Sequence, residues 1–590
     1  MISPIFLLLL VLSAQLVLPQ PCQAELSLPT PKDHYQSYDA NQSGLKLFLE
    51  VVNELDPATQ KLAMELINAP DTSGIRKVPR SEMLAVMRAI DWKERKGELL
   101  EVFLHQSNIL DIIPRGSSKE WVPIVHDALL YFLDRLDEER LIDRLLDLAY
   151  LPPDNSRGDR ILQFTARTPT FQKIGQILAR NPGLEADIQR ALQTLENSLA
   201  TSTRAELVDF IGIQLGTDTL EKYQIRFADR ILAEASVGAV IRADLQMPGE
   251  PGRREVVCKI IKPYVLKAIP EELAIIDELT RYFGRHGEFY ELGKMPLAEM
   301  FQSIRKSIAE EIRIEEEQRN LQRAAGYYEG NSRILVPHLY PFSTPRVTVM
   351  EFVHGEKISN AFQGDPNKRR VMARRLSDVL TADVIFSPQA EALFHADPHA
   401  GNVFHVLDDP KDPYRIALLD WGLSGLFPRS QRSELVQLIL GIQLRDASRL
   451  RRHLSALIEG DLPKDSEKQR ELDQLITETL QQRSRRSNFD TLSDLIFRLG
   501  KDGYVLRFNI TLFIKSQVTI AGILAGLDPT LNQDDYLMNR ARGLVVRELP
   551  KHLLNTIWFP AWNSHNYRSM LSNEDIKDVV FHGIKGWFRK

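Results

Sequence analysis

The stretch that decides the fold is "EALFHADPHAGNVFHV", Glu391 to Val406, followed after a short gap by "IALLDWGLSG" from Ile416. Asp397 precedes Asn402 by five residues, and Asp420 ends an apolar run and is followed by Trp-Gly. A loop aspartate, an asparagine at this spacing and a strand-end Asp-x-Gly recur together in phosphoryl-transfer sites. Because Mg²⁺ prefers oxygen ligands, we expect Asn402 and Asp420 to bind the metal and Asp397 to accept a proton or orient a nucleophile.

The same loop allows a second interpretation. His395, Asp397 and His399 would share one face of a strand and could then bind a transition metal for hydrolysis. Pro398 lies inside this trio and Gly401 follows it, so the pattern favours a bent loop over a strand. A metal-dependent hydrolase is therefore the less favoured alternative.

Phosphoryl transfer also needs a strand lysine for the phosphates and a helix glutamate to hold that lysine. Lys259 in "EVVCKII" lies in the middle of an apolar run and is the expected lysine, whereas Lys262, just before Pro263, is expected to be solvated. The partner is expected among the glutamates of one acidic helix, most of which form a solvated face: Glu310, Glu311, Glu315, Glu316 and Glu317.

A phosphate-covering turn is expected between the first two predicted strands. It contains one glycine, so backbone N–H groups and Ser236 are expected to bind the phosphates. The predicted nucleotide-binding residues are Leu232, Ala233, Glu234, Ala235, Ser236, Val237, Gly238, Ala239 and Val240, together with Lys259.

Composition limits the class of protein. The chain has 590 residues, 74 Lys and Arg and 79 Asp and Glu, so its net charge of −5 argues against nucleic acid as a partner. The two cysteines, Cys22 and Cys258, are too few for a disulfide framework or for zinc held by thiolates alone.

The N-terminus carries an apolar run, Ile5 to Leu18, which is short for a membrane span. It is followed by a small-residue site, Cys22-Gln23-Ala24, as in a cleaved export signal, but no Lys or Arg precedes it. A cleaved signal and an uncleaved membrane anchor both stay open, and Lys32 is compatible with an anchor that leaves the rest of the chain in the cytoplasm. No other stretch is expected to be long and apolar enough to span a membrane.

Several motifs in one order resemble the UbiB/AarF family of atypical kinase-like proteins. They are the Lys-x-Gly-Gln motif in "PTFQKIGQILAR", the alanine-rich loop "AEASVGAV", the lysine strand "VVCK", the loop "HADPHAGNVF" and the "LLDWG" motif. The resemblance covers roughly residues 162–532.

The resemblance implies a protein-kinase-like fold that binds ATP and Mg²⁺. It implies that Lys173, Gly175 and Gln176 gate the nucleotide pocket, and the family offset assigns Glu317 as the partner of Lys259. Family members act in ubiquinone or other isoprenoid-lipid metabolism, which implies a quinone or isoprenoid lipid, its biosynthetic proteins and a membrane surface as partners.

Three positions depart from the family pattern: Arg313 replaces an aspartate, Glu234 an alanine and Ala239 a glutamine. A carboxylate facing nucleotide phosphates would repel them. A pseudokinase that acts as a lipid-binding or scaffold protein is therefore the alternative function, and export would suit such a protein.

The predicted fold class is α+β: a two-lobed protein-kinase-like fold, with a small mixed N-lobe and a mainly helical C-lobe, preceded by an all-α N-terminal extension. The predicted segments are 1–24 signal peptide or anchor, 25–43 linker, 44–150 helical region, 160–354 Lys-x-Gly-Gln helix and N-lobe, 355–545 C-lobe and 546–590 tail, with the last helix at most an interfacial anchor.

Overall fold

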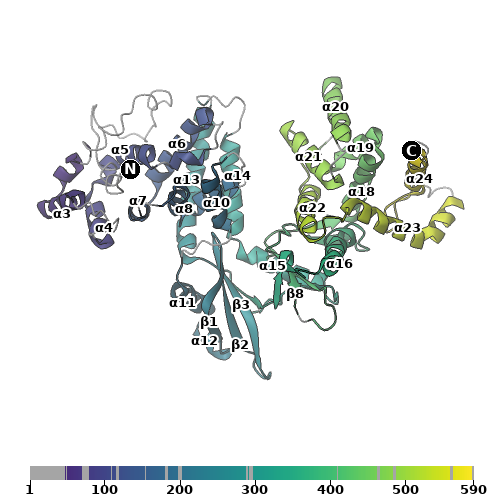
Figure 1. Cartoon of the computed structure of the whole chain (residues 1–590), viewed down its shortest axis with the longest axis horizontal. Coiled ribbons are helices and arrows are strands. Elements are labelled where there is room, and N and C mark those ends of the chain that lie inside the picture. Colours follow the sequence, from purple (N-terminus) through teal and green to yellow (C-terminus); the bar gives the residue numbers. More distant parts are fainter. Residues whose placement is uncertain are drawn as a thin grey trace. The chain divides into compact units, whose positions relative to one another are not determined.

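The structure is a computed structural model that falls into two compact units (Figure 1). Unit 1 comprises Met1–Ile314 and Phe342–Val349, and unit 2 comprises Glu315–Pro341 and Met350–Lys590. The described residues are 47, 49–68, 79–107, 109–113, 118–152, 155–179, 184–196, 202–287, 290, 297–407, 409–460, 465–482, 487–557 and 563–587. The predicted signal or anchor and the predicted linker lie outside them, and the segment boundaries predicted above remain predictions.

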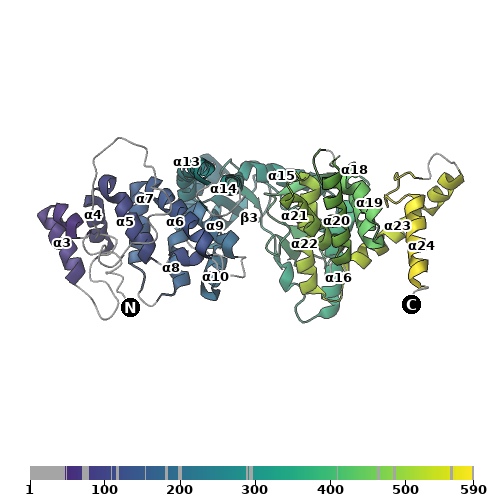
Figure 2. The ribbon, with the colours of Figure 1, turned by 90° about the horizontal axis from the view of Figure 1, so that it is seen from above.

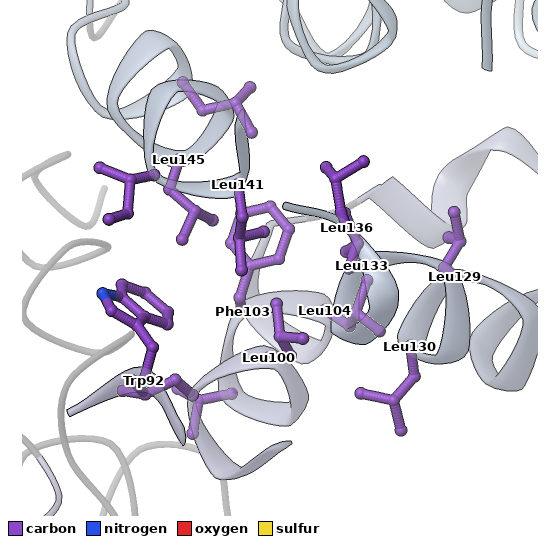
Figure 3. Packing of buried hydrophobic residues seen from close by; sticks show 14 of the residues in the cluster. Trp92, Leu100, Phe103, Leu104, Leu129, Leu130, Leu133, Leu136, Leu141 and Leu145 are labelled. Carbon is purple, nitrogen blue, oxygen red and sulfur yellow. The ribbon is translucent and has the colours of Figure 1, made fainter. Parts of the chain in front are cut away.

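Unit 1 begins with the predicted helical region. Its helices are α3 (Pro57–Asn68), α4 (Arg80–Ala89), α5 (Trp92–Gln106), η1 (Ile109–Ile112), α6 (Ser118–Arg135) and α7 (Glu138–Ala149). Their apolar stripes meet in one core, where leucines of α5, α6 and α7 surround Phe103 (Figure 3). Trp92 is buried in the same core, and its indole N–H donates to the carbonyl of Met87 at 2.7 Å. The helical stripes are therefore core, as expected from their spacing.

A second group of helices follows in unit 1: α8 (Arg157–Thr165), α9 (Pro169–Ala179), α10 (Ala186–Gln193), η2 (Thr194–Glu196), α11 (Arg204–Leu215) and α12 (Thr217–Lys222). Local sequence explains several of their starts. Ser156 and Thr203 each cap a helix whose third residue, Asp159 or Glu206, bonds back to the cap.

The sheet of unit 1 positions the predicted lysine. Its order is β1 (Arg226–Glu234), β2 (Gly238–Gln246), β3 (Arg253–Ile261) and β5 (Val347–Glu351). β2 pairs antiparallel with both β1 and β3, and Lys259 of β3 lies opposite Val240. Burial alternates along β2, as a half-buried strand requires. The helices α13 (Pro263–His286) and α14 (Leu297–Glu311) follow.

Unit 2 contains two small sheets and most of the remaining helices. One sheet has the order β4 (Ile334–Leu335), β9 (Ile416–Leu418), β8 (Val403–Val406) and β6 (Gly355–Lys357), and in the other β10 (Ser424–Pro428) pairs with β7 (Glu391–His395). The helices are α15 (Ile314–Tyr327), η4 (Ile358–Asn360), α16 (Pro366–Ser377), η5 (Asp378–Ala382), α17 (Asp383–Ile385), α18 (Arg429–Leu444), α19 (Ala447–His453), η6 (Leu454–Ala456), α20 (Ser466–Gln482), α21 (Asn488–Lys501), α22 (Phe508–Leu527), α23 (Gln533–Ile557) and α24 (Asn573–Trp587). The described chain is thus mixed α and β and mostly helical, as predicted.

The helix α22 corrects one expectation. It has 20 residues and a mean hydropathy of 1.6, so by length and composition it could cross a membrane, and within the described residues no other helix meets that criterion. The expectation that only the N-terminus is apolar enough was wrong. Half of this apolar window is buried, with Phe513, Ile514 and Ile520 inside the cores of unit 2. Packing explains the buried half of these side chains, so α22 is weak evidence for a membrane span.

Candidate functional site

In unit 1, α9 is bonded to the turn between β1 and β2. The amide Nε2 of Gln176 donates to the hydroxyl of Ser236 at 3.2 Å. One helical turn earlier lies Gln172, which is fully buried; with its amide nitrogen facing the turn, it donates to the Ser236 carbonyl at 3.0 Å. The hydroxyl of Tyr264 donates to the same carbonyl at 3.1 Å. Three side chains therefore hold the turn predicted to cover phosphates.

Gly175 allows α9 to lie this close. A Cβ at this position would stand 2.6 Å from Cδ1 of Leu195 and 3.1 Å from Cδ2 of Leu192. Gln176 also donates to the carbonyl of Leu195 at 3.1 Å. Gly175 and Gln176 thus fix α9 in its place, while Lys173 lies half-buried on the same helix. The predicted gating role of all three residues stays a prediction.

The structure corrects the expectation for Lys262. This lysine is fully buried, and its Nζ lies 2.8 Å from Oε1 of Glu234, whose side chain is only 9% exposed. Burial lowers the pKa of Lys262, and the hydrogen bond to Glu234 opposes that shift. The sequence could not reveal this pair because it joins the end of β1 to the residue after β3. Glu234 therefore has a cation beside it, which weakens the argument that it repels phosphates.

Lys259 has the environment expected of a phosphate-binding lysine. It is half-buried on β3, and Val257 and Ile261, which lie on the same face of this strand, are buried. Apolar walls strengthen the interaction of an ammonium with an anion because they lower the local dielectric.

In unit 2, the loop after β7 brings Asn402 and Asp397 together. Asn402 is 8% exposed, and its Nδ2 donates to the Asp397 carbonyl at 3.1 Å. The backbone carbonyl of Asn402 accepts from the N–H of Leu419 at 2.8 Å. Since Asp420 follows directly, the two predicted metal motifs are held side by side by the backbone.

His395 joins the same two motifs, a function that the sequence did not reveal. Its Nε2–H donates to the Leu419 carbonyl at 2.9 Å, and its Nδ1 accepts from the N–H of Asp397 at 3.3 Å. The ring is buried, and burial lowers its pKa, although the bond to Leu419 and the nearby carboxylates oppose the shift. A neutral Nε2–H tautomer satisfies both contacts.

This arrangement argues against the transition-metal alternative. Both ring nitrogens of His395 are engaged by the backbone, and His399 lies 4.0 Å from Asp397 with both side chains half exposed. Within the described part of the chain, no group of three or more His, Cys, Asp or Glu could hold a metal ion. The trio interpretation was wrong. The ring of His395 bonds the backbone of Leu419 and Asp397, whereas the ring of His399 accepts from the N–H of Gly401.

The carboxylates of Asp397 and Asp420 are exposed to solvent. Asp420 has a φ of 53°, the left-handed region that aspartate tolerates better than most residues, and the N–H of Gly422 donates to its Oδ1 at 3.2 Å. The amide nitrogen of Asn402 donates to the loop carbonyl of Asp397, so the amide oxygen is the atom that can bind a cation. Asn402 and Asp420 thus supply oxygen donors of the kind that Mg²⁺ prefers, and nucleotide phosphates can complete its coordination.

Helix α15 is bonded to the second motif. Asn320 is buried, and its Nδ2 donates to the Trp421 carbonyl at 3.0 Å. Glu317, one turn earlier, is 8% exposed, whereas Glu315 and Glu316 are exposed. Among these three, only Glu317 departs from the solvated face expected for most of the run. Glu317 belongs to unit 2 and Lys259 to unit 1, so their pairing stays a prediction.

Residues 194–454 match the family model described as "ABC1 atypical kinase-like domain". They contain the sheet of unit 1 and, in unit 2, Asp397, Asn402 and Asp420. The chain carries an ABC1 atypical kinase-like domain. That match supports a kinase-like fold for residues 194–454.

The curated proteins that are similar to this chain are consistent with the ABC1 match. The chain is 29% identical to "Probable protein kinase UbiB" of Aeromonas hydrophila subsp. hydrophila over 300 residues, 50% of this chain and 53% of the relative. Proteins with the same name from Azotobacter vinelandii and Glaesserella parasuis serovar 5 are 29% and 26% identical, over 52% and 55% of this chain and 56% and 60% of theirs. The chain thus spans about half the length of the curated relatives it matches.

A solved structure, the complex of Rv3197 with erythromycin from Mycobacterium tuberculosis, is 20% identical and covers 60% of this chain and 87% of that one. Its TM-score of 0.38 is too low to carry an argument about the ABC1 domain. The helical region from α3 to α9 precedes the matched ABC1 residues.

Proposed function

We propose that the protein is an ATP- and Mg²⁺-binding atypical kinase or ATPase of the UbiB type. The observation that carries the proposal is the backbone link between Asn402 and Leu419, which holds the Asp397 loop beside Asp420. The ABC1 match supports nucleotide binding by this domain.

In this proposal, individual residues have separate roles in phosphoryl transfer. Asp397 is exposed and can accept a proton from a hydroxyl or water. Asn402 and Asp420 would hold Mg²⁺, which would neutralise part of the negative charge of bound ATP. Lys259, held by Glu317, would bind the α- and β-phosphates, and the turn at Ser236 would cover them.

Titration calorimetry of the full chain with ATP tests the proposal, in the presence of Mg²⁺ and of a chelator. We expect Mg²⁺-dependent binding that Asp420→Asn abolishes. Asp502→Asn, at an exposed position of the same unit, is the matched control and should bind as the parent does. A parent that binds no ATP, or an Asp420→Asn variant with the same Mg²⁺ dependence, would contradict the proposal.

One observation favours the pseudokinase as a second candidate. Ser236 is only 6% exposed, with side chains of α9 and Tyr264 bonded to it, so phosphates could reach its hydroxyl only by displacing neighbouring side chains. Phosphate release from ATP separates the two candidates. Mg²⁺-dependent turnover that Asp420→Asn abolishes excludes the pseudokinase, whereas ATP binding without turnover supports it.

We further propose that the protein works at a membrane in ubiquinone or other isoprenoid-lipid metabolism. Support comes from exposed apolar residues on α23 and α24: Val546, Leu549, Leu553, Leu554, Val580 and Phe581. Arg547 and Lys551 are exposed beside those of α23, as in helices that lie on anionic lipid. Co-flotation with vesicles, with and without anionic lipid, tests this, and Leu549→Ser with Leu553→Ser should abolish it.

The N-terminal apolar segment is proposed as a membrane anchor that leaves the ABC1 domain in the cytoplasm, with export after cleavage as the alternative. Protein sequencing of the mature N-terminus distinguishes the two. A chain that begins after Ala24 would contradict the anchor.

A further inference from the structure

Unit 1 contains a large apolar cavity outside the sites described above. Its volume is about 380 Å³, and it lies among η1, α6, α8, α9, α10, α13 and α14. Most of these helices lie side by side in two perpendicular views (Figures 1 and 2). It is lined by residues of the helical region before the ABC1 match as well as by residues of that domain.

Helix α9 forms one wall of the cavity with its apolar face. Phe171, Ile174, Gly175 and Leu178 all line it, and their spacing of three and four residues places them on one side of the helix. Gln172 and Gln176 lie on another side of α9 and bond the Ser236 turn. One helix therefore separates the cavity from the turn predicted to cover phosphates.

The lining defines the chemistry of an occupant. None of the described lining residues is charged, and apart from Thr165 and Thr170 they carry apolar side chains or, at Gly175, none. Thr165 donates its hydroxyl to the carbonyl of Leu162 at 2.8 Å, so it is already paired. A charged group would be strongly disfavoured here because nothing compensates its desolvation.

The size of the cavity argues for an occupant. An apolar cavity of about 150 Å³ already stays dry and binds benzene. A volume of about 380 Å³ falls within the range of small-molecule sites.

We propose that this cavity binds one uncharged long-chain lipid tail, and that its occupancy is linked through α9 to nucleotide binding at the Ser236 turn. A tail packed against Phe171 and Leu178 orders α9, and α9 carries the two glutamines that hold the turn. The linkage rests on the proposed function, whereas tail binding does not. The shared chemistry, a hydrocarbon chain with an uncharged head, fits both acyl and prenyl tails.

Trp121 lines the cavity and reports on its contents. The probe is dibrominated stearyl alcohol, whose bromines quench tryptophan fluorescence at short range. We expect saturable quenching of the full chain that Trp121→Phe removes. Competition by unlabelled stearyl alcohol and by farnesol separates acyl from prenyl preference.

Ala128 on α6 lines the cavity, so Ala128→Phe should fill part of it and weaken probe binding by about tenfold. Ala85→Phe, at an exposed position of α4, is the matched control and should bind like the parent. Ala128→Leu is the smaller filling change if the phenylalanine variant does not fold. No saturable quenching in the parent, or equal affinity in a folded filled variant, overturns the site.

The linkage has its own measurement. The dissociation constant for Mg²⁺-ATP should change by about fivefold or more when stearyl alcohol is bound, and probe affinity should change by the same factor when ATP is bound. Quenching without this reciprocal change overturns the linkage and leaves the tail site standing. A chain that binds the probe but no ATP contradicts the proposed function and the linkage together.

Discussion

The side-chain amide of Gln176 donates a hydrogen bond to the hydroxyl of Ser236 at 3.2 Å, and so ties the Lys-x-Gly-Gln helix to the predicted phosphate turn. Ser236 is also only 6% exposed, so a phosphate could reach its hydroxyl only if neighbouring side chains moved away. Helix α9 and a nucleotide therefore compete for the same turn in unit 1.

Gln176→Ala should strengthen Mg²⁺-ATP binding. A net hydrogen bond contributes about 0.5–1.5 kcal/mol, so we expect affinity to rise roughly threefold to tenfold in titration calorimetry. Gln189→Ala, which removes another amide bonded to a backbone carbonyl at the end of α9, is the control and should leave affinity unchanged. A weaker affinity in Gln176→Ala would mean that the glutamine supports the nucleotide.

Glu234→Ala should destabilise unit 1, because it leaves the fully buried ammonium of Lys262 without its carboxylate partner. Breaking a buried pair from one side costs about 3–5 kcal/mol, which urea unfolding can resolve. Replacing both residues, with Glu234→Gln and Lys262→Met, should cost much less. Glu250→Ala breaks a pair with Arg254 that is nearly half exposed, and should cost under about 1 kcal/mol.

His126 should make the stability of α6 depend on pH. Burial lowers its pKa, but hydrogen bonds to Asp127 and Glu101 outweigh that effect and raise it from 6.5 to about 9. Because the folded value lies above the unfolded one, the stabilisation is complete below pH 6.5 and is lost as pH rises through about 9.

The shift corresponds to roughly 2–4 kcal/mol. Hydrogen exchange of α6 should therefore accelerate, beyond its intrinsic pH dependence, over this window in the parent and not in His126→Gln. His338→Gln, at an exposed position, should keep the parental profile. An identical profile in His126→Gln would show that another group titrates.

His395→Phe should weaken Mg²⁺ binding in the presence of ATP. It leaves the Leu419 carbonyl and the Asp397 N–H without their partner, at about 1–3 kcal/mol each. His405→Phe is the matched control: this buried imidazole also bonds a backbone carbonyl, that of Pro413 at 2.9 Å, but does not bridge the two motifs. Both variants should lose stability, and only the first should need more Mg²⁺ for ATP binding.

Local sequence patterns predicted helices and strands well where the residues of a single helix or strand are enough to determine it. The β-branched apolar run "VVCKII" predicted β3 with Lys259 inside it. The spacing of Asp397, Asn402 and Asp420 predicted that their two loops lie close together, as the bond from the Leu419 N–H to the Asn402 carbonyl shows. Helical spacing likewise predicted the N-terminal helices, because one apolar face needs no knowledge of its partner.

What the sequence did not show depends on partners distant along the chain. The burial of Lys262 depends on Glu234 across the sheet, and the task of His395 depends on a carbonyl at Leu419. In the sequence, Gln172 does not differ from other polar helix residues, because its bond to the Ser236 carbonyl depends on how the turn packs against α9. For α22, composition alone cannot separate an apolar core from a lipid environment.

The packing of α22 also bears on how the chain is synthesised. The elements that pack most closely against it, η4, α16, β10, α18 and α21, precede it in the sequence. A nascent chain therefore has the partners of its most apolar helix already outside the ribosome when that helix emerges, and domains fold as their N-terminal parts become available. The interval in which α22 could be captured by a translocon, a chaperone or another chain is short, and a permuted chain that began at α22 would lose this protection.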